Sequence, residues 1–280
     1  MGNTLLTIFT PTYNRINELE RLYSSLISQT DFRFEWLIVD DGSTDDTENM
    51  VVSWLDTSPF PIRYIKQPNS GKHVAHNHGA TEASGEYFIC VDSDDWLEPN
   101  AVETILHDIT ALDTWFPDGA DKIELADMRM KYGLVIETAI VFNTDVLRRH
   151  PFPVVQGERF IPEGSAYYDF VAPELFCVHN EPFYRCEYLE EGLTKNIWKN
   201  WLGSPVGTRM ALVKRHESAR RYSSVRALRE RISALVGIES LNMAVAEPVF
   251  SRIDSNRVLA LLVFPLSVLV ERRRFGRKVS

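Results

Sequence analysis

Three aspartates, Asp92, Asp94 and Asp95, lie within four residues directly after an apolar run at residues 87–91. Five apolar residues without polar alternation are typical of a strand that is covered on both faces. Like charges this close raise one another's pKa unless a cation lies among them, and carboxylate oxygens suit a hard divalent ion such as Mg²⁺ or Mn²⁺. The pattern therefore predicts a metal site at the end of this strand. A lone Asp-x-Asp pair is more often an acidic turn, so the rest of the chain decides.

Polar side chains also follow two earlier apolar runs. Tyr13 comes after residues 5–10, and Asp41 comes after residues 36–39. Strand-like and helix-like segments alternate at short spacing, which predicts βαβ units, a parallel sheet and right-handed crossovers. Ligands of such sheets bind beyond the carboxyl ends of the strands, near the switch in strand order. We therefore expect Asp41 and Asp94 to share one crevice.

The segments between these runs have helical patterns. The first helix has an apolar face at helical spacing, formed by Leu19, Leu22, Leu26 and Ile27. Ser43 is the expected N-cap of the second helix, whose apolar face is formed by Val51, Trp54 and Leu55. A third helix is expected to begin at Gly71 and to end at Gly85. Further on, we expect a helix at residues 99–112, a loop at 114–122, a strand at 134–142, a short helix capped by Asn143, and short strands at 176–178 and 183–187.

Charge is distributed unevenly over the 280 residues, whose net charge is −9. Residues 209–280 contain 15 Lys/Arg and 6 Asp/Glu, a balance of +9, which leaves 15 against 33, or −18, for residues 1–208. We expect a catalytic domain at residues 1–208 and a basic, amphipathic helical extension at 209–280. An acidic body argues against nucleic-acid binding, whereas a basic extension with apolar runs favours an anionic surface such as a membrane leaflet.

The extension ends in an uncharged run of 13 residues, 258–270, which Pro265 interrupts and which a basic stretch at 272–278 follows. A membrane span needs about 20 apolar residues, so this run is too short to cross a bilayer and is expected to lie in its interface. Packing on the body or on a second subunit, and hence a homo-oligomer, is the alternative. Residues 209–231 suit one or two amphipathic helices, with a solvated basic face as the equal alternative.

Several classes of protein do not fit. No G-x-G-x-x-G follows the first strand and no P-loop is present, which excludes a Rossmann dinucleotide enzyme and a P-loop NTPase. The three cysteines include no C-x-x-C pair, so neither a disulfide framework nor a cysteine zinc site is expected. The N-terminus lacks the pattern of a secretory signal, which favours the cytoplasm. His73, His76 and His78 are close together, but with no other ligand cluster nearby they are expected to be packed or solvated rather than to bind zinc.

Four motifs occur in a fixed order: T-P-T-Y-N-R at residues 10–15, V-D-D-G-S-T-D at 39–45, N-S-G-K followed by A-H-N-H-G-A at 69–80, and V-D-S-D-D-W-L at 91–97. Together they resemble a family 2 glycosyltransferase of the GT-A fold, of the kind that acts in bacterial polysaccharide and cell-envelope synthesis. The resemblance covers about the first 200 residues. It implies an α/β fold with a Rossmann-like, mostly parallel sheet flanked by helices. It does not specify the donor sugar.

The resemblance also implies roles for individual residues. Seven are expected to bind the nucleotide sugar: Pro11, Tyr13, Arg15, Asp41, Lys72, Asp92 and Ser93. Asp41 would accept a hydrogen bond from the base, and Lys72 would lie near the phosphates. Asp94 is the stronger candidate for direct contact with Mn²⁺ or Mg²⁺, while Asp92 would act on the ribose, through water or on the metal. His179, which follows an expected strand, is a further candidate ligand.

An inverting transfer is implied, in which a carboxylate removes a proton from the acceptor hydroxyl while a metal stabilises the departing diphosphate. The family commonly places this base in an E-D pair after the metal site, and the nearest equivalent is Pro162-Glu163-Gly164, which lacks the second acid. Glu163 is the first choice for the base, with Glu158 and Asp169 as alternates. No Q-x-x-R-W motif is present, so transfer of a single sugar is expected rather than polymer synthesis.

The expected donor is a UDP-sugar, and the expected acceptor is a glycan or a lipid-linked acceptor. The protein is expected to work at the inner face of the cell membrane. A non-catalytic nucleotide-sugar-binding or scaffold subunit with the same fold is the alternative, because the base motif is incomplete. A haloacid-dehalogenase phosphatase, which also uses Asp-x-Asp after a strand, fits poorly because its motif follows the first strand.

Overall fold

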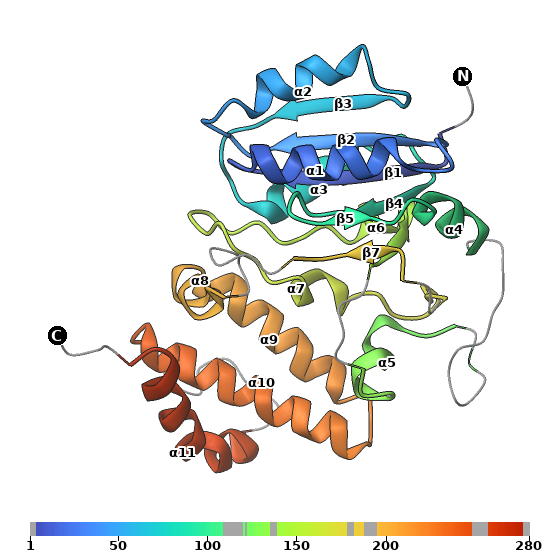
Figure 1. The fold of residues 1–280 in the computed structure, drawn as a ribbon. Helices are drawn as coiled ribbons and strands as arrows, with labels where there is room; N and C mark the ends of the chain where they lie inside the picture. The colour runs from blue at the N-terminus through green and yellow to red at the C-terminus, as the bar shows by residue number, and fades with distance from the viewer. Residues whose placement is uncertain are drawn as a thin grey trace. The chain divides into compact units, whose positions relative to one another are not determined.

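A computed structural model describes residues 4–108, 120, 122–134, 139–177, 182–187, 195–247 and 257–276 (Figure 1). The chain forms two compact units that alternate along the sequence. The first contains Met1–Lys122, Glu137–Pro151 and Cys177–Glu190, and the second contains Ile123–Ile136, Phe152–Phe176 and Glu191–Ser280. The second unit thus takes segments from well before residue 209. The functional division at residue 208 stays a prediction.

The first unit is built on a five-stranded sheet in the order β3-β2-β1-β4-β6. Its strands are β1 (Leu6–Thr12), β2 (Phe34–Asp40), β3 (Ile62–Lys66), β4 (Tyr87–Cys90) and β6 (Val141–Asn143). β1 pairs in parallel with β2 and with β4, and β2 pairs in parallel with β3, whereas β6 pairs antiparallel with β4. This confirms the mostly parallel sheet, with β1 and β2 buried along their whole length.

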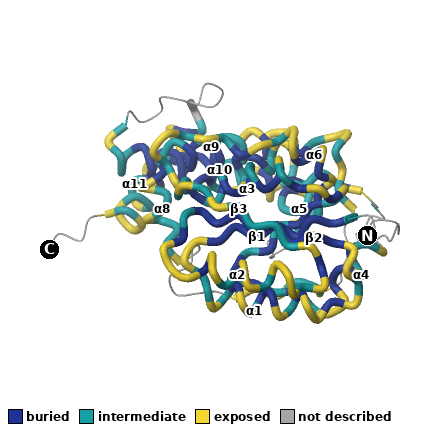
Figure 2. The backbone as a smooth tube through the Cα atoms, turned by 90° about the horizontal axis from the view of Figure 1, so that it is seen from above, coloured by how far each residue is buried: buried dark blue, intermediate teal, exposed yellow. Residues whose placement is uncertain are grey.

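Helices cover both faces of this sheet (Figure 2). On one face lie α1 (Ile16–Ile27), α2 (Thr47–Leu55) and α4 (Ala101–Asp108), and on the other lie α3 (Lys72–Glu82) and α6 (Thr144–Arg149). The predicted apolar stripe of α1 is buried at Leu19, Leu22 and Leu26, which pack in one cluster with strand residues such as Ile8 and Trp36. Two residues predicted on apolar faces are instead exposed, because each is the last residue of its helix: Ile27 and Leu55.

The turn after β2 corrects one prediction. Ser43 does not cap α2, which begins at Thr47 after Asp46. The Ser43 N–H donates to Asp40 Oδ1 at 2.7 Å, and its hydroxyl accepts from the Asn14 N–H at 2.9 Å. Ser43 therefore connects the ends of β1 and β2. The cap predicted at Asn143 is confirmed, since its side chain accepts from two backbone N–H groups at the start of α6.

The later strands are shorter than predicted. β5 (Trp96–Leu97) pairs antiparallel with β7 (Tyr184–Arg185), which lies in the expected strand at 183–187. Of the strand expected at 134–142, only its end is present, in β6, and residues 135–138 lie outside the described residues. Phe176 forms an isolated bridge with Ile123, while residues 114–119 and 178 also lie outside the described residues.

The second unit is helical. Its helices are α5 (Leu125–Met130), α7 (Gly164–Tyr167), α8 (Ile197–Gly203), α9 (Pro205–Ala219), α10 (Val225–Ala244) and α11 (Arg257–Arg274). Residues 209–231 thus fall in two helices, whose Leu212 and Leu235 pack with Val263 of α11. Pro265 lies inside α11 and does not end it. Within the described residues, no helix is long and apolar enough to cross a membrane.

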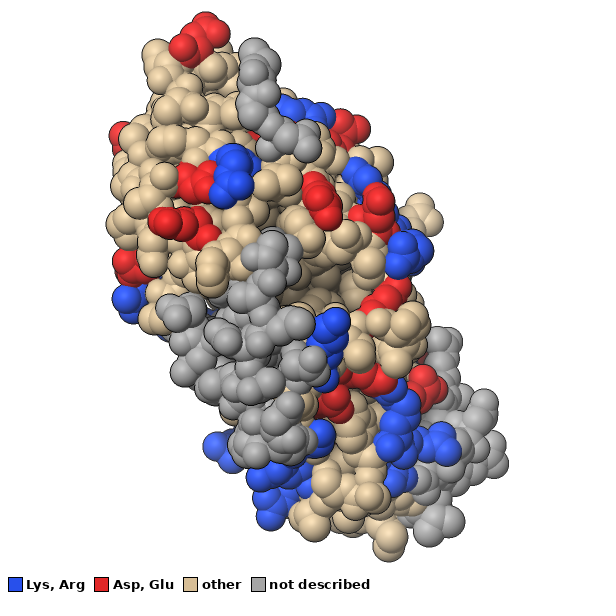
Figure 3. Space-filling model, turned by 90° about the vertical axis from the view of Figure 1, so that its right-hand side faces the viewer, with Lys and Arg blue, Asp and Glu red and all other residues tan. Residues whose placement is uncertain are grey.

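Charge also separates on the surface. On the face drawn in Figure 3, lysine and arginine side chains gather mainly in the lower part, with acidic side chains between some of them. In the second unit several arginines form ion pairs, including Arg221 with Glu124 at 2.6 Å and Arg209 with Glu247 at 2.8 Å. Part of the basic character is therefore compensated within that unit.

Gly85 offers a test of the packing between the end of α3 and β1. A Cβ on Gly85 would lie 2.6 Å from the Thr7 nitrogen and 2.7 Å from the Leu6 carbonyl carbon, and neither backbone atom can move away easily. Gly85→Ala should lower the free energy of unfolding by about 1–3 kcal/mol in urea denaturation. Gly203→Ala, where a Cβ meets nothing within 4 Å, is the matched control and should change it by less than about 0.5 kcal/mol. Equal midpoints for both variants would contradict the close approach.

Candidate active site

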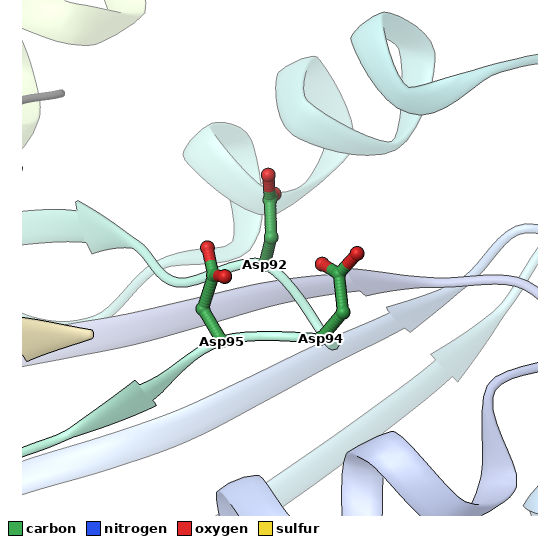
Figure 4. A group of neighbouring side chains, drawn as sticks. All are labelled: Asp92, Asp94 and Asp95. Carbon is green, nitrogen blue, oxygen red and sulfur yellow. The ribbon is translucent and has the colours of Figure 1, made fainter. Parts of the chain in front are cut away.

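The acidic cluster lies in the turn between β4 and β5. One carboxylate oxygen from each of Asp92, Asp94 and Asp95 lies within 4.8 Å of the others, and the three side chains point to the same side of the turn (Figure 4). This is the only such group of three potential metal ligands among the described residues. The turn itself is closed by the Asp95 N–H, which donates to the Asp92 carbonyl at 3.0 Å. The predicted convergence of these carboxylates is therefore present.

Asp92 is paired with a cation. Lys72 Nζ lies 2.7 Å from Asp92 Oδ2, and both side chains are about one-third exposed. Lys72 is the first residue of α3, so the start of this helix places an ammonium group beside the cluster. Ser93, the residue between the first two aspartates, is buried. Lys72, which is predicted near the nucleotide or its phosphates, thus contacts Asp92, which is predicted to act on the ribose, through water or on the metal.

Asp95 is held by β7. Its Oδ2 accepts from the Tyr184 hydroxyl at 2.5 Å, and its Oδ1 accepts from the Glu187 N–H at 3.2 Å. Burial raises the pKa of Asp95 to about 6, although the hydrogen bond from Tyr184 opposes this rise. Sequence reasoning missed Tyr184, because nothing in a two-residue strand indicates which turn it will contact.

Asp94 is the least engaged member of the cluster. Burial and the charge of Asp92 raise its pKa, while Arg15 and Lys72 act in the opposite direction. Its own backbone N–H also acts to lower this pKa, and within the described part of the chain the side chains of Asp92 and Asp95, but not that of Asp94, are engaged by Lys72 and Tyr184. Its oxygens are therefore the most available to an added ligand.

Arg21 of α1 fixes the backbone of this turn. Its guanidinium donates to the Asp94 carbonyl at 2.5 Å and to Glu187 at 2.5 Å. It also lies over the Trp96 ring, 4.4 Å from the centroid, as in a cation–π contact. This residue, too, was not predicted from the sequence, since α1 presents it opposite to the apolar stripe.

Asp41 holds the loop that leads into α3. Its carboxylate accepts from Gln67 Nε2 at 2.8 Å, the Ser70 N–H at 2.9 Å and the Gly71 N–H at 2.7 Å, and the residue is 5% exposed. Because Gly71 precedes Lys72, this loop connects Asp41 with Asp92. Asp41 and the acidic cluster therefore belong to one edge of the sheet, while the crevice that Asp41 and Asp94 are expected to share stays a prediction. Whether Asp41 receives a base stays a prediction.

The end of β1 contributes the remaining predicted residues. Pro11 is buried within the strand, whereas the ring of Tyr13 is 46% exposed. Arg15 lies 3.5 Å from Glu18 and is close enough to Asp94 to affect its pKa. Asn14 Oδ1 accepts from the Thr44 N–H at 2.8 Å, which joins the turn after β1 to the turn after β2.

The histidines of α3 lie mainly in the core. His73 and His76 are buried, and the His76 ring lies edge-on to Phe9 and Phe88. Burial lowers the pKa of His76 to about 3, so it is neutral at ordinary pH. His78 Nδ1 lies 2.9 Å from Gln67 Oε1. His179 lies outside the described residues.

The three acids considered for the general base belong to the second unit. Both oxygens of Glu158 accept backbone N–H groups in the first turn of α9, from Val206 and Gly207, each at 2.8 Å. Asp169 is paired with Lys214 of α9. Glu163 is exposed and directly precedes α7, at a loop-to-helix junction. Which of them acts as a base stays a prediction.

The segment that contains the acidic cluster matches a known protein family. The family described as Glycosyl transferase family 2 matches residues 7–117, which include β1 to β5 and the acidic cluster. Residues 7–117 are thus similar to the domain of family 2 glycosyltransferases. The chain is 39% identical over 100 residues to glycosyltransferase GlyA of Streptococcus pneumoniae, which is 36% of this chain and 14% of that protein. It is 38% identical over 102 residues to chondroitin synthase of Pasteurella multocida, again 36% of this chain and 10% of that protein.

A third sequence relative and a solved structure are also similar to the chain. YibD of Escherichia coli K12, an uncharacterized glycosyltransferase, is 35% identical over 101 residues, which is 36% of this chain and 29% of that protein. The chain therefore matches less than a third of the length of each of these three relatives. The crystal structure of Staphylococcus aureus TarS 1–349 with UDP-GlcNAc aligns with a TM-score of 0.59 at 17% identity, covering 99% of this chain and 93% of TarS 1–349. This likeness confirms the GT-A fold.

The hydroxyl of Tyr184 can be tested through the titration of Asp95. Tyr184→Phe removes a donor to the charged carboxylate, so the pKa of Asp95 should rise above about 6. A folded-state pKa above the unfolded value near 3.8 means that the folded state holds the proton more tightly. The stabilisation that proton binding by Asp95 gives to the folded state is then lost as pH rises through the folded pKa. The variant should therefore lose more stability at pH 7.5 than at pH 4.

Carboxyl-detected NMR and urea denaturation at both pH values measure these changes. Tyr64→Phe is the matched control, because the Tyr64 hydroxyl donates to Asp40 at 2.5 Å in the same unit. It should leave the titration of Asp95 unchanged. An unchanged midpoint for Asp95 in Tyr184→Phe would mean that this hydrogen bond does not hold the cluster.

Proposed function

We propose that the chain transfers a single sugar from a nucleotide-sugar donor, with a UDP-sugar favoured, to a hydroxyl of a glycan or lipid-linked acceptor. The observation that carries this proposal is the acidic cluster beside Lys72, at the sheet edge of a domain that is similar to family 2 glycosyltransferases. TarS, whose fold is similar, has been crystallised with UDP-GlcNAc and with UDP. The matched relatives are likewise named as glycosyltransferases or glycan synthases.

A divalent metal fits the residues present. Three carboxylates supply hard oxygen ligands within 4.8 Å of one another. Burial, and to a smaller extent the neighbouring aspartates, raises the pKa values of Asp94 and Asp95, so an added cation would favour their charged forms. Asp94 would hold Mn²⁺ or Mg²⁺ directly, with Asp92 as a second ligand or a partner of the ribose. When bound, the ion supplies positive charge that stabilises the departing diphosphate.

The chain's own residues bind and orient the donor in this proposal. The exposed ring of Tyr13 offers a flat apolar surface to the base, next to the buried Pro11. Asp41 supplies carboxylate oxygens at the sheet edge, and the cations of Arg15 and Lys72 attract the phosphates. Ser93, which is buried between Asp92 and Asp94 in the sequence, would line the donor site.

Glu163 is our candidate for the base that accepts the proton of the acceptor hydroxyl, so that the reaction inverts the anomeric centre. Its position at a loop-to-helix junction supports this choice. Glu158 is a weaker candidate because both of its oxygens already accept N–H groups of α9, and Asp169 is paired with Lys214. The second candidate function is a non-catalytic nucleotide-sugar-binding or scaffold subunit, which the single acid in Pro162-Glu163-Gly164 favours.

We further propose that the protein acts at the inner face of the cell membrane as a peripheral protein, with residues 1–208 as the catalytic part. The basic and apolar composition of residues 209–280 supports this location, and the acidic balance of the remainder supports the absence of nucleic-acid binding.

Metal binding should depend on Asp94 and on pH. Mn²⁺ should raise the melting temperature of the wild-type protein, because a ligand of the folded state stabilises it. Asp94→Asn should remove this increase and lower turnover by about 10²–10³-fold. Because the pKa values of Asp94 and Asp95 are raised, the latter to about 6, protons compete with the ion. Affinity measured by calorimetry should therefore fall as pH decreases from 7.5 to 5.5.

Asp31→Asn is the control for this experiment, since Asp31 is a surface carboxylate whose pKa Arg33 lowers. It should leave the binding of Mn²⁺ unchanged. Turnover that is equal in wild type and Asp94→Asn would remove the metal role from Asp94. Absence of binding to UDP-, GDP- and dTDP-sugars, with Mn²⁺ present, would count against the nucleotide-sugar proposal as a whole.

The base can be identified by separating turnover from stability. Glu163→Gln should lower turnover by about 10²–10⁴-fold and leave donor affinity unchanged. Glu158→Gln should instead destabilise the protein by about 1 kcal/mol, because one oxygen that accepts an N–H of α9 becomes a donor. If Glu163→Gln has full turnover and Asp169→Asn does not, Asp169 is the base. Absence of transfer in the wild-type protein, with intact donor binding, would favour the scaffold subunit.

A further inference from the structure

Helix α11 has two apolar faces. One face packs within the second unit, where Val263 is buried against Leu235 and Ile238 of α10. The other face is exposed and carries four leucines, which we call the leucine stripe: Leu261, Leu262, Leu266 and Leu269 are exposed by 60%, 73%, 48% and 63%. Leu262, Leu266 and Leu269 follow Leu261 by one, five and eight residues, which places all four side chains on one side of a helix. A surface helix normally presents polar residues on this side.

Basic residues continue the leucine stripe at the C-terminal end of α11. Arg272 and Arg273 are exposed and lie eleven residues after Leu261 and Leu262, so that they fall on the same side of the helix. Arg274 is turned to α8, where its guanidinium lies over the Trp198 ring, 3.9 Å from the centroid. The end of α11 is therefore fixed to the second unit while two arginines stay exposed.

We infer that the leucine stripe with Arg272 and Arg273 binds an anionic lipid surface, with α11 lying in the plane of the membrane. Apolar burial and attraction to anionic headgroups together give the binding energy of such helices. The uncharged run is 13 residues long, whereas a span needs about 20. Pro265, which lies within the stripe, cannot donate to the Leu261 carbonyl, so this carbonyl favours a position within reach of water.

A second copy of the chain fits the leucine stripe less well. Each partner of a standard protein interface buries roughly 800 Å², and four leucine side chains supply only part of such an area. The centres of interfaces are also depleted of charged residues, whereas here exposed arginines continue the stripe. Charge complementarity therefore favours the lipid surface.

Sedimentation of the full chain with lipid vesicles tests the inference. The probes are vesicles of phosphatidylcholine alone and vesicles of phosphatidylcholine mixed with phosphatidylglycerol. The wild-type protein should bind the mixed vesicles, and the triple variant Leu261→Gln, Leu262→Gln, Leu269→Gln should bind them at least about tenfold more weakly. Arg272→Gln with Arg273→Gln should lose about tenfold in affinity and most of the preference for phosphatidylglycerol.

Val154→Gln is the matched control, because Val154 is 65% exposed in the second unit but lies in a loop far along the chain from α11. It should bind vesicles as the wild type does, and all variants should have the wild-type melting temperature because the altered side chains are exposed. Equal binding of wild type and triple variant, or no binding of the wild type to phosphatidylglycerol, would overturn the inference. So would a wild-type dimer in light scattering that the triple variant abolishes. Because this readout needs neither donor nor acceptor, it is independent of the proposed sugar transfer.

Discussion

The crowding of three carboxylates at the end of β4 is the constraint on which the site depends. Asp92, Asp94 and Asp95 are drawn together by a tight turn, and like charges at this separation oppose one another. The fold compensates part of this repulsion with groups from other elements: Lys72 from α3, and the Tyr184 hydroxyl and Glu187 N–H from β7 and its end. The pKa values of Asp94 and Asp95 stay raised, chiefly by burial and further by the charges of the neighbouring aspartates.

This compensation also explains why the site needs elements that are distant in sequence. The Asp41 carboxylate binds the N–H groups of Ser70 and Gly71 and so fixes the start of α3. Lys72 follows at once and reaches Asp92. A change at Asp41 would therefore reach the acidic cluster through three consecutive residues, even without any contact between the two. The ends of β2 and β4 are therefore connected through the start of α3.

Much of this arrangement could be predicted from the sequence. The uninterrupted apolar runs and the Gly71-Lys72 helix start gave the parallel sheet and the position of α3, because both depend on local pattern. Arg21 and Tyr184 could not be found in this way, since their partners at the Asp92–Asp95 turn lie more than 70 residues away in sequence. Ser43 was mistaken for a helix cap because Asn14 and Asp40, which occupy its polar groups, come from tertiary structure. Pro265 remains inside α11 because packing on α10 offsets one missing hydrogen bond.

The acids at residues 158–169 are a second case in which tertiary contacts add what the sequence pattern does not contain. In sequence, Glu158, Glu163 and Asp169 all follow the acidic cluster, and only the partial match of Pro162-Glu163-Gly164 to the family's motif ranks Glu163 first. Their partners distinguish them: proton uptake by Glu158 would weaken two hydrogen bonds at the N-terminus of α9, where a negative charge is favourable, and proton uptake by Asp169 would break its pair with Lys214. A general base must gain and lose a proton in every turnover, so a carboxylate that also holds the fold together is poorly suited to the task. Glu163 directly precedes the single helical turn of α7, at a loop-to-helix junction.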